Sequence, residues 1–257
     1  MQTRRTRTII KIEQLIRYIP LLSQDTLQLT HRCNLSCITC ALWKLPPSQE
    51  PAIKLKNKQL KKTYHLVGGE PFLSQRLQKL LLFLKKKKCI VKFWTNGQFS
   101  LDKWASILPY VDTVFMYLPA TDAETYRIIT GDDGYEDVME KIDYLKSEEK
   151  KVIINVPIQT DMIDLLPDIH ALAIQKKCGL LFHYCPQEAF AKDQIELINR
   201  YRHIPNVQVF QNHFPDAQYC VGYVDAVVHD KKQILRNWFE KVITSFYSLL
   251  DHREHKR

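Results

Sequence analysis

Hydrophobic and polar positions follow two periodicities that alternate along the chain. Short runs rich in β-branched and aromatic residues recur, and stretches with apolar residues at helical spacing separate them. This alternation is typical of parallel strands joined by crossover helices, so it predicts an α/β protein. The predicted strands span residues 26–30, 63–67, 90–95, 113–118, 152–158 and 180–184.

The stretches between these strands predict amphipathic helices. Two of them carry a continuous apolar stripe, and residues 165–177 predict a third helix. We expect Ser74 to cap the first of these helices. The two stripes consist of Leu77, Leu80, Leu81 and Leu84, and of Tyr135, Val138, Ile142 and Leu145.

Six strand–helix units are too few to close an eight-stranded barrel, but right-handed crossovers still curl the sheet. The predicted fold is therefore a partial (β/α)6 TIM-type barrel, open on one side, with functional residues at the carboxyl ends of its strands. We assign residues 25–204 to this barrel and residues 1–24 to a basic segment with a helix. Residues 205–257 are expected to form a small α+β appendage, with short antiparallel strands at 207–210 and 219–229 and a helix at 233–252.

The composition is that of an ordinary globular protein with one unusual feature. Of its 257 residues, 45% are hydrophobic and 25% are charged, but only 7 are glycine, whereas average usage would give about 18. Collagen-like and flexible-linker proteins are therefore excluded. Unbroken apolar runs are short, as at residues 80–84, so we expect no membrane span. Charged residues interrupt the basic N-terminal segment where a secretory signal would be apolar, which favours a cytoplasmic protein.

The net charge of +9 admits two interpretations. An anionic partner such as nucleic acid is one. The lysines, however, concentrate at residues 54–62 and 85–88, beside predicted helical stripes, which is typical of solvated helix faces. We therefore expect no nucleic-acid partner.

Three of the seven cysteines, Cys33, Cys37 and Cys40, lie on the segment that follows the first predicted strand. A disulfide framework is not expected in a chain of this length in a reducing compartment. Soft thiolates at this spacing can converge on one iron–sulfur cluster, and three ligands for four irons leave one iron open for chemistry. A zinc site and three buried thiols are the alternatives, although no nearby Cys or His pair has zinc-finger spacing.

Several motifs in register resemble the radical S-adenosylmethionine (SAM) superfamily. The cysteines form its CxxxCxxC signature, residues 68–71 read Gly-Gly-Glu-Pro, residues 95–97 read Thr-Asn-Gly, and residues 131–138 are similar to its glycine turn. The resemblance implies a [4Fe–4S] cluster held by Cys33, Cys37 and Cys40, with SAM as the second cofactor. It implies an enzyme that cleaves SAM reductively and abstracts hydrogen from a substrate, either a peptide or a small metabolite, with flavodoxin or ferredoxin as reductant. The alternative is an iron–sulfur scaffold protein that has lost radical chemistry.

The strand-end motifs also have a physical interpretation. Paired glycines at Gly68 and Gly69 let the backbone approach a ligand closely, and Pro71 ends the strand. The resemblance implies that the Glu70 carboxylate receives the amino group of SAM. Asn96 is placed at the rim of the site, although an Asn-Gly pair is also an ordinary turn signal. 

Asn155, on the fifth predicted strand, is a candidate polar group inside the barrel. A core asparagine whose hydrogen bonds are satisfied within the protein is the alternative. These considerations give Gly68, Gly69, Glu70, Pro71, Asn96 and Asn155 as the candidate SAM-binding residues, and they identify no catalytic side chain.

The chain departs from the family pattern at two positions. Thr39 stands where an aromatic residue commonly precedes the third cysteine, although Trp43 follows closely, and Tyr117 begins a Tyr-Leu-Pro that replaces the common Ser-Leu-Asp. Among the other cysteines, Cys89 and Cys178 are expected to be packed thiols.

Cys185 would face the mouth of the site. Cys220 opens an auxiliary-cluster pattern that lacks its later CxxC, so we expect a single cluster. His31, His183 and His213 are further candidate polar groups, with solvent-exposed or structural roles as the alternatives.

Overall fold

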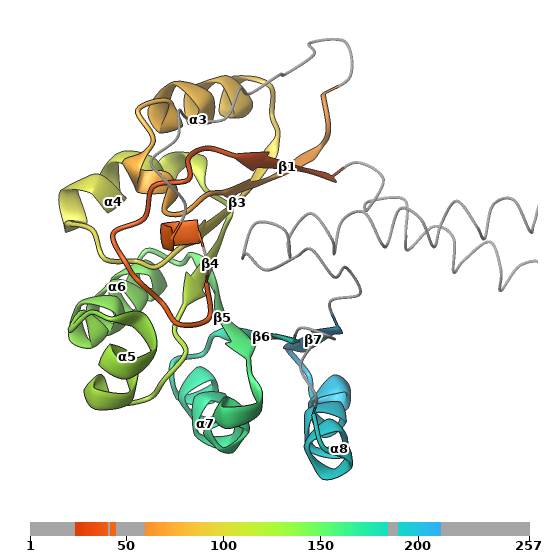
Figure 1. Ribbon diagram of the computed structural model, residues 1–257. Coiled ribbons are helices and arrows are strands. Elements are labelled where there is room, and N and C mark those ends of the chain that lie inside the picture. The colour runs from red at the N-terminus through yellow and green to blue at the C-terminus, as the bar shows by residue number, and fades with distance from the viewer. Residues whose placement is uncertain (1–23, 41, 45–59, 185–189, 212–257) are drawn as a thin grey trace, which may run out of the picture.

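A curved sheet of seven parallel strands, in the same order as the sequence, forms the centre of the molecule (Figure 1). The computed structural model describes residues 24–40, 42–44, 60–184 and 190–211. All neighbouring strands pair in parallel. The strands are β1 (Gln24–Gln28), β2 (Thr63–Val67), β3 (Ile90–Thr95), β4 (Thr113–Tyr117), β5 (Lys151–Ile158), β6 (Gly179–Tyr184) and β7 (Val207–Gln211).

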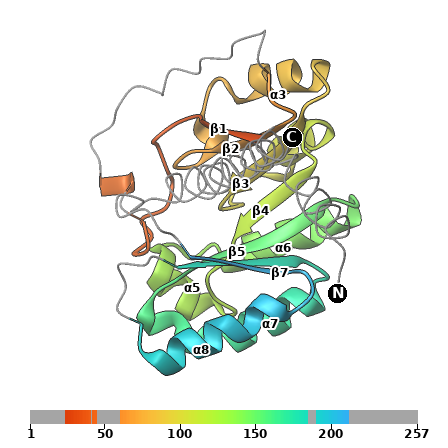
Figure 2. The ribbon, with the colours of Figure 1, turned by 90° about the vertical axis from the view of Figure 1, so that its right-hand side faces the viewer.

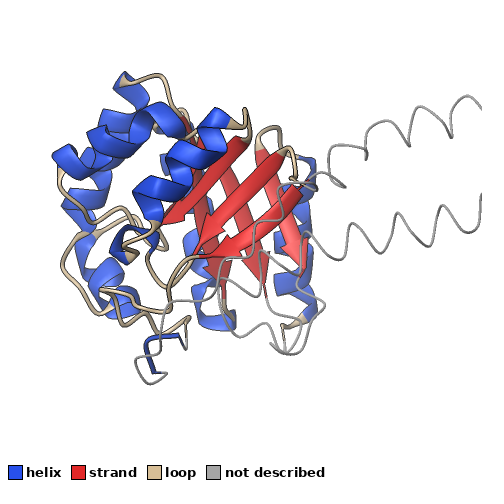
Figure 3. Cartoon of the chain, turned by 90° about the horizontal axis from the view of Figure 1, so that it is seen from above, coloured by secondary structure: helices blue, strands red, loops and turns tan. Residues whose placement is uncertain are grey.

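Helices follow the strands and cover the outer side of the sheet (Figures 2 and 3). The α-helices are α3 (Leu77–Lys86), α4 (Leu101–Ile107), α5 (Ala123–Thr130), α6 (Tyr135–Ser147), α7 (Leu166–Gln175) and α8 (Lys192–Arg200). Short 3-10 helices are η1 (Leu42–Lys44), η3 (Pro71–Leu73), η4 (Leu108–Tyr110), η5 (Thr160–Leu165) and η6 (Tyr201–His203). None of the helices that the structure describes is long and apolar enough to span a membrane.

Alternation along each strand divides the buried residues between the two faces of the sheet. The outer face, under the helices, carries the main apolar core, to which Leu66, Phe93 and Met116 belong. The neighbours of these residues form a second apolar layer on the inner face. Both faces are buried, which explains why the strands are apolar almost throughout. The inner layer consists of Leu42, Val67, Trp94, Phe115, Ile153 and Leu181.

The predicted partial TIM-type barrel is confirmed, and the six predicted strands agree with the structure to within two residues. The prediction of an antiparallel strand at 207–210 is wrong, because β7 pairs in parallel with β6 and extends the sheet to seven strands. Helix α8, which the sequence did not indicate clearly, supplies the crossover that a parallel strand requires. The elements predicted at 219–229 and 233–252, and the N-terminal segment 1–24 apart from its last residue, lie outside the described residues. The domain limits at 24 and 204 stay predictions.

Both predicted apolar stripes are buried on one side of α3 and α6. Ser74, however, does not cap α3, which begins at Leu77 with Arg76 in the N-cap position. Its hydroxyl instead donates a hydrogen bond to the Leu29 carbonyl (3.4 Å) and accepts one from the Arg76 backbone (3.3 Å). Ser74 therefore connects the end of η3 to the segment after β1.

Candidate functional site

The segment after β1, residues 30–40, carries the three cysteines, and we call it the cysteine loop. It lies at the carboxyl ends of the strands, which we call the carboxyl face of the barrel. Gly69 and Glu70 donate backbone hydrogen bonds to the carbonyls of Thr30 (2.8 Å) and Arg32 (2.7 Å). The loop therefore continues the pairing of β1 with β2 beyond the ends of both strands.

Gly68 and Gly69 are needed because of this contact. A Cβ atom on Gly69 would lie 2.3 Å from the Arg32 carbonyl oxygen, and one on Gly68 would lie 2.9 Å from that of Thr30. Both distances are shorter than real Cβ contacts. The sequence predicted a close backbone approach to a ligand at these glycines, and the structure places the backbone of the cysteine loop there. Both glycines also line the hollow described below.

The other end of the cysteine loop is held by the C-terminal end of α5 and the glycine that follows it. Ser36 and Ile38 donate backbone hydrogen bonds to the carbonyls of Thr130 (3.1 Å) and Ile129 (2.9 Å). A Cβ atom on Gly131 would lie 2.2 Å from the Ser36 hydroxyl oxygen. The glycine turn thus packs directly against the cysteine loop.

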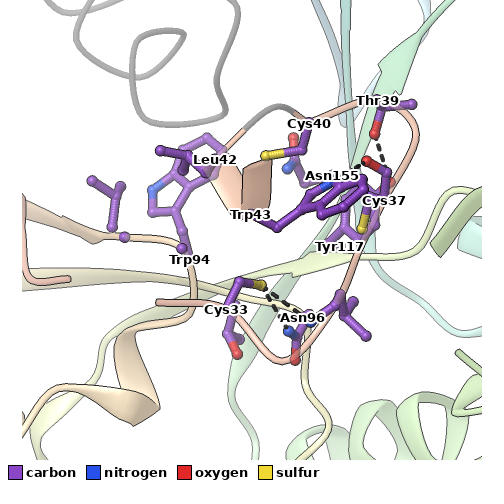
Figure 4. Close-up of a pocket in the computed structure, with 15 residues that line it drawn as sticks. Cys33, Cys37, Thr39, Cys40, Leu42, Trp43, Trp94, Asn96, Tyr117 and Asn155 are labelled. Atoms are coloured by element: carbon purple, nitrogen blue, oxygen red, sulfur yellow. Dashed lines mark hydrogen bonds between the residues drawn. The ribbon is translucent and has the colours of Figure 1, made fainter. Parts of the chain in front are cut away.

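The three thiols line one hollow at the carboxyl face, with an empty volume of about 670 Å³ that includes space open to solvent (Figure 4). Apolar side chains from the inner layer form much of its wall, among them Trp94, whose ring stacks on Phe115 with centroids 4.1 Å apart. The hollow is lined by Cys33, Leu35, Cys37, Thr39, Cys40, Leu42, Trp43, Val67, Gly68, Gly69, Trp94, Thr95, Asn96, Tyr117 and Asn155.

Hydrogen-bond donors are directed at the sulfur atoms of Cys33 and Cys37. The Cys33 Sγ atom accepts from the Leu35 backbone (3.4 Å) and from Asn96 Nδ2 (3.9 Å). Burial raises the pKa of the Cys33 thiol to about 11 and that of Cys37 to about 12, although a hydrogen bond from Tyr117 opposes the shift at Cys37. Iron binding through thiolates therefore releases protons from both groups.

The donor set fits an iron–sulfur cluster. Within the described ranges, no three His, Cys, Asp or Glu side chains are placed to bind a single metal ion. In a cluster each thiolate binds its own iron, so the three sulfurs do not need to meet at one point. Soft thiolates on one loop, with N–H donors directed at sulfur, are the arrangement that such a cluster requires.

Glu70 is fully buried and its carboxylate points toward the loop after β3. It accepts hydrogen bonds from the Asn96 backbone (2.8 Å), the Thr95 hydroxyl (2.9 Å) and the Phe72 backbone (3.1 Å). Burial raises its pKa to about 7 against the effect of these donors. Neither Glu70 nor Pro71, which begins η3, is among the residues that line the hollow. Glu70 therefore joins two loops of the site.

Asn96 lies between the cysteine loop and the loop after β3, and it lines the hollow. Its Nδ2 atom donates to Asn34 Oδ1 (2.8 Å) as well as to Cys33, and its Oδ1 atom accepts from the Gln98 backbone (3.1 Å). The Gln98 side chain extends this network, because it accepts from Asn34 (3.2 Å) and donates to Asp132 (2.8 Å). No pattern in the sequence pointed to Gln98, because its role depends on three loops that meet only in the folded protein.

Asn155, near the middle of β5, projects from the inner face into the hollow (Figure 4). It is only 4% exposed, and its Oδ1 atom has no hydrogen-bond partner among the described residues. Buried side-chain oxygens normally accept a hydrogen bond. Asn155 is therefore placed to accept one from a molecule bound in the hollow.

The two departures from the family pattern contact each other. The Thr39 and Tyr117 hydroxyls lie within hydrogen-bond distance (2.9 Å), and both residues line the hollow (Figure 4). Trp43 donates from Nε1 to the Cys37 carbonyl (2.9 Å). The sequence could not pair Thr39 with Tyr117, because 78 positions separate them.

The remaining candidates lie elsewhere. Cys89 and Cys178 follow the ends of α3 and α7, away from the cysteine loop. His183 is buried on β6, and burial lowers its pKa to about 3, so its imidazole is neutral at physiological pH. His31 lies half-buried in the cysteine loop. Cys185, His213 and Cys220 lie outside the described residues.

The fold and the site together define a class: a partial α/β barrel with a three-cysteine loop at its carboxyl face. The profile of the Radical SAM superfamily matches residues 27–170, so the chain belongs to the Radical SAM superfamily. The family implies a [4Fe–4S] cluster and SAM as its cofactors. No curated protein sequence matches the chain.

Solved structures share the fold. Streptococcus suis SuiB bound to S-adenosylmethionine superposes with a TM-score of 0.56 at 15% identity, over 80% of this chain and 51% of SuiB. SuiB bound to precursor peptide SuiA superposes with a TM-score of 0.58 at 15% identity, over 83% of this chain and 56% of SuiB. The enzyme anSMEcpe with bound AdoMet and a peptide gives 0.53 at 15% identity, over 69% and 59%. The chain thus spans between half and three fifths of the length of these proteins.

Proposed function

We propose that the protein cleaves SAM reductively and abstracts a hydrogen atom from a peptide or small-molecule substrate, with a [4Fe–4S] cluster held by Cys33, Cys37 and Cys40. The observation that carries the proposal is the single hollow that these three thiols share with the glycines after β2 and with Asn155. SAM needs open space beside the cluster, and the hollow provides it.

The residues of the hollow have distinct proposed roles. Gly68 and Gly69 line the hollow and contact SAM with backbone atoms, and Asn96 and Asn155 contact it with their amide groups. Glu70 acts on the same cofactor through the Thr95–Asn96 segment that it binds, and Pro71 begins the short helix η3 that carries the Phe72 backbone donor.

When bound, the two cofactors supply a 5′-deoxyadenosyl radical that removes a hydrogen atom from the substrate. The chain's own contribution is orientation and the exclusion of water. The inner layer around Trp94 and Phe115 lines the space below the cysteine loop with apolar groups, which keeps water away from reactive species.

A peptide is the substrate class that the comparisons favour, because SuiB is described bound to precursor peptide SuiA and anSMEcpe bound to a peptide. A small metabolite is the other class. Flavodoxin or ferredoxin is the proposed electron donor. The cysteines of the cysteine loop are not joined in disulfides, which suits the reducing cytoplasm, where we propose that the protein acts.

Anaerobic reconstitution with iron and sulfide tests this function. We expect about four irons per chain, and we expect 5′-deoxyadenosine to form when dithionite and SAM are added. Cys37→Ala should abolish both. Cys89→Ala is the matched control, because it removes a buried thiol far from the cysteine loop. A full cluster without SAM cleavage would contradict the proposal and favour the scaffold alternative.

A further inference from the structure

Tyr117 is the last residue of β4 and lies against the cysteine loop. Its side chain packs with Leu35 and Cys37 and is 8% exposed. Its hydroxyl lies 2.9 Å from Thr39 Oγ1 and also hydrogen bonds to the Cys37 thiol group. Figure 4 shows the three side chains together at one end of the hollow.

The protons carried by Cys37, Tyr117 and Thr39 determine which group donates each hydrogen bond. A thiolate bound to iron carries no proton, so Cys37 can only accept. The single proton of the Tyr117 hydroxyl must then point at sulfur, and the Tyr117 oxygen is free to accept from Thr39. The three groups form a chain in which Thr39 donates to Tyr117 and Tyr117 donates to Cys37.

We propose that Tyr117 is a positioning residue whose hydroxyl, oriented by Thr39, donates a hydrogen bond to the Cys37 thiolate and raises the reduction potential of the cluster. The inference rests on the proposed function in one respect, that Cys37 binds a [4Fe–4S] cluster. It assigns to Thr39 a role that it exerts only through Tyr117.

The physical reason is electrostatic. One electron from a low-potential donor converts the [4Fe–4S]²⁺ state to [4Fe–4S]⁺, with no bond broken and no proton transferred. The added negative charge spreads onto the thiolate sulfurs, so a donor at sulfur stabilises the reduced state more than the oxidised state. The apolar contact with Leu35 strengthens the effect, because it keeps water from competing for the sulfur.

Tyr117→Phe tests the proposal, because it removes the hydroxyl and keeps the ring. The measurement is a redox titration of the reconstituted protein without SAM, followed by electron paramagnetic resonance, with the iron content determined in parallel. At a fixed potential we expect the ratio of reduced to oxidised cluster to fall about tenfold, which for one electron corresponds to ~59 mV. Tyr64→Phe is the matched control, because that hydroxyl accepts a hydrogen bond from the Lys61 backbone on the outer face, away from the cysteine loop, and it should leave the ratio unchanged.

Two substitutions at Thr39 keep the test informative if Tyr117→Phe binds less iron. Thr39→Val should lower the ratio about threefold, and Thr39→Ser, which keeps the hydroxyl, should restore it. In the Tyr117→Phe background, Thr39→Val should have no further effect, because Thr39 acts through Tyr117.

An unchanged potential in both Tyr117→Phe and Thr39→Val, with the cluster fully assembled, would overturn this inference and leave the proposed function intact. A wild-type chain that assembles no cluster would overturn both. A wild-type cluster that forms but does not cleave SAM would overturn the proposed function, while a lowered potential in Tyr117→Phe would still support the inference.

Discussion

At the two ends of the barrel, different residues occupy the tight turns beside the helices. Where α3, α6 and α7 turn into the next strand, the chain adopts a left-handed conformation at Lys88 (φ 56°), Glu149 (φ 56°) and Lys177 (φ 52°). Each of these turns closes with two backbone hydrogen bonds to the last turn of its helix, the pattern of a Schellman motif. Glycine is the usual residue at this position, but all three side chains point into solvent and meet no obstacle.

At the carboxyl face, glycine is retained. Gly131 ends α5 with φ 74°, close to the values at the opposite end, but its missing Cβ makes room for Ser36. Gly69 and Gly134 do not adopt a left-handed conformation, and a Cβ there would lie 2.3 Å from Arg32 and 1.9 Å from Gln98. The difference indicates that this glycine-poor chain keeps glycine for space beside the cysteine loop more than for backbone freedom.

Gly69→Ala should have the largest effect, because it fills the space that the carboxyl face keeps for the cysteine loop. The added Cβ meets backbone atoms of Arg32 and His31, which cannot move without displacing the cysteine loop. We expect the free energy of unfolding to fall by at least ~3 kcal/mol, and iron binding to be lost. Urea unfolding and iron analysis measure the two effects.

Gly179→Ala at the start of β6 is the control for this change. Its added Cβ would lie 3.2 Å from the Ile153 Cγ1 atom, a contact that a shift of a few tenths of an ångström relieves. We expect a loss of no more than ~1 kcal/mol with full iron binding. Equal losses at Gly69 and Gly179 would contradict the special role of the carboxyl face.

Glu70 allows a second test of the difference between the two ends. The carboxyl face contains a buried carboxyl group, so its stability should depend on pH, whereas the turns after α3, α6 and α7 are closed by backbone hydrogen bonds. The pKa of Glu70 rises from 4.5 to about 7 on burial, so between these values the folded chain holds more protons than the unfolded chain. The contribution of protonated Glu70 to the free energy of unfolding is therefore complete below pH 4.5 and is lost as the pH rises through about 7. At about 1.4 kcal/mol per pKa unit the loss is ~3 kcal/mol.

The Glu70→Gln variant should lack this dependence, because its amide stays neutral. Unfolding of the cofactor-free protein by urea at pH 5 and pH 8 measures the difference. A wild-type chain that is as stable at pH 8 as at pH 5, relative to Glu70→Gln, would show that Glu70 is ionised in the folded state at both values.

Gly131→Ala, combined with a change at Ser36, distinguishes two reasons for glycine at this position: the left-handed backbone and the space beside Ser36. We expect it to cost ~2 kcal/mol, from left-handed strain and from the clash with the Ser36 hydroxyl. Ser36→Ala in the same chain removes the nearest atom and leaves the Ser36 Cβ at 3.5 Å, so about half of the loss should be recovered. If Ser36→Ala recovers nothing, backbone strain alone explains Gly131.

The smallest effect is expected at the opposite end of the barrel. Lys177→Gly should raise the free energy of unfolding by ~0.5–1 kcal/mol, because glycine adopts the left-handed conformation without strain, in part offset by its greater entropy when unfolded. Glu149→Gly should act in the same direction. Thermal unfolding detects the gain, and a loss at both positions would mean that these side chains make stabilising contacts.

Much of this molecule could be predicted from local patterns. Residues 63–67 and 90–95 were predicted as strands with the bounds that the structure has, because a run of β-branched and aromatic residues and the helical spacing beside it are local properties. The cysteine loop was also found from spacing alone. The seventh strand was assigned the wrong pairing, because the helix before it, α8, is mostly polar and buries one residue, Ile198, so the sequence did not identify it as a crossover helix.

The order of strands and helices, the position of the cysteine loop after β1 and the scarcity of glycine could all be read from the amino-acid sequence, since each depends on residues close together in the chain. Three features follow from the folded arrangement alone: Glu70 turns toward Thr95 and Asn96, Thr39 meets Tyr117, and Asn155 keeps an unpartnered oxygen among the described residues. These contacts join loops that converge at the carboxyl face only after the sheet has curled. Local periodicity carries no information about which side chains meet there.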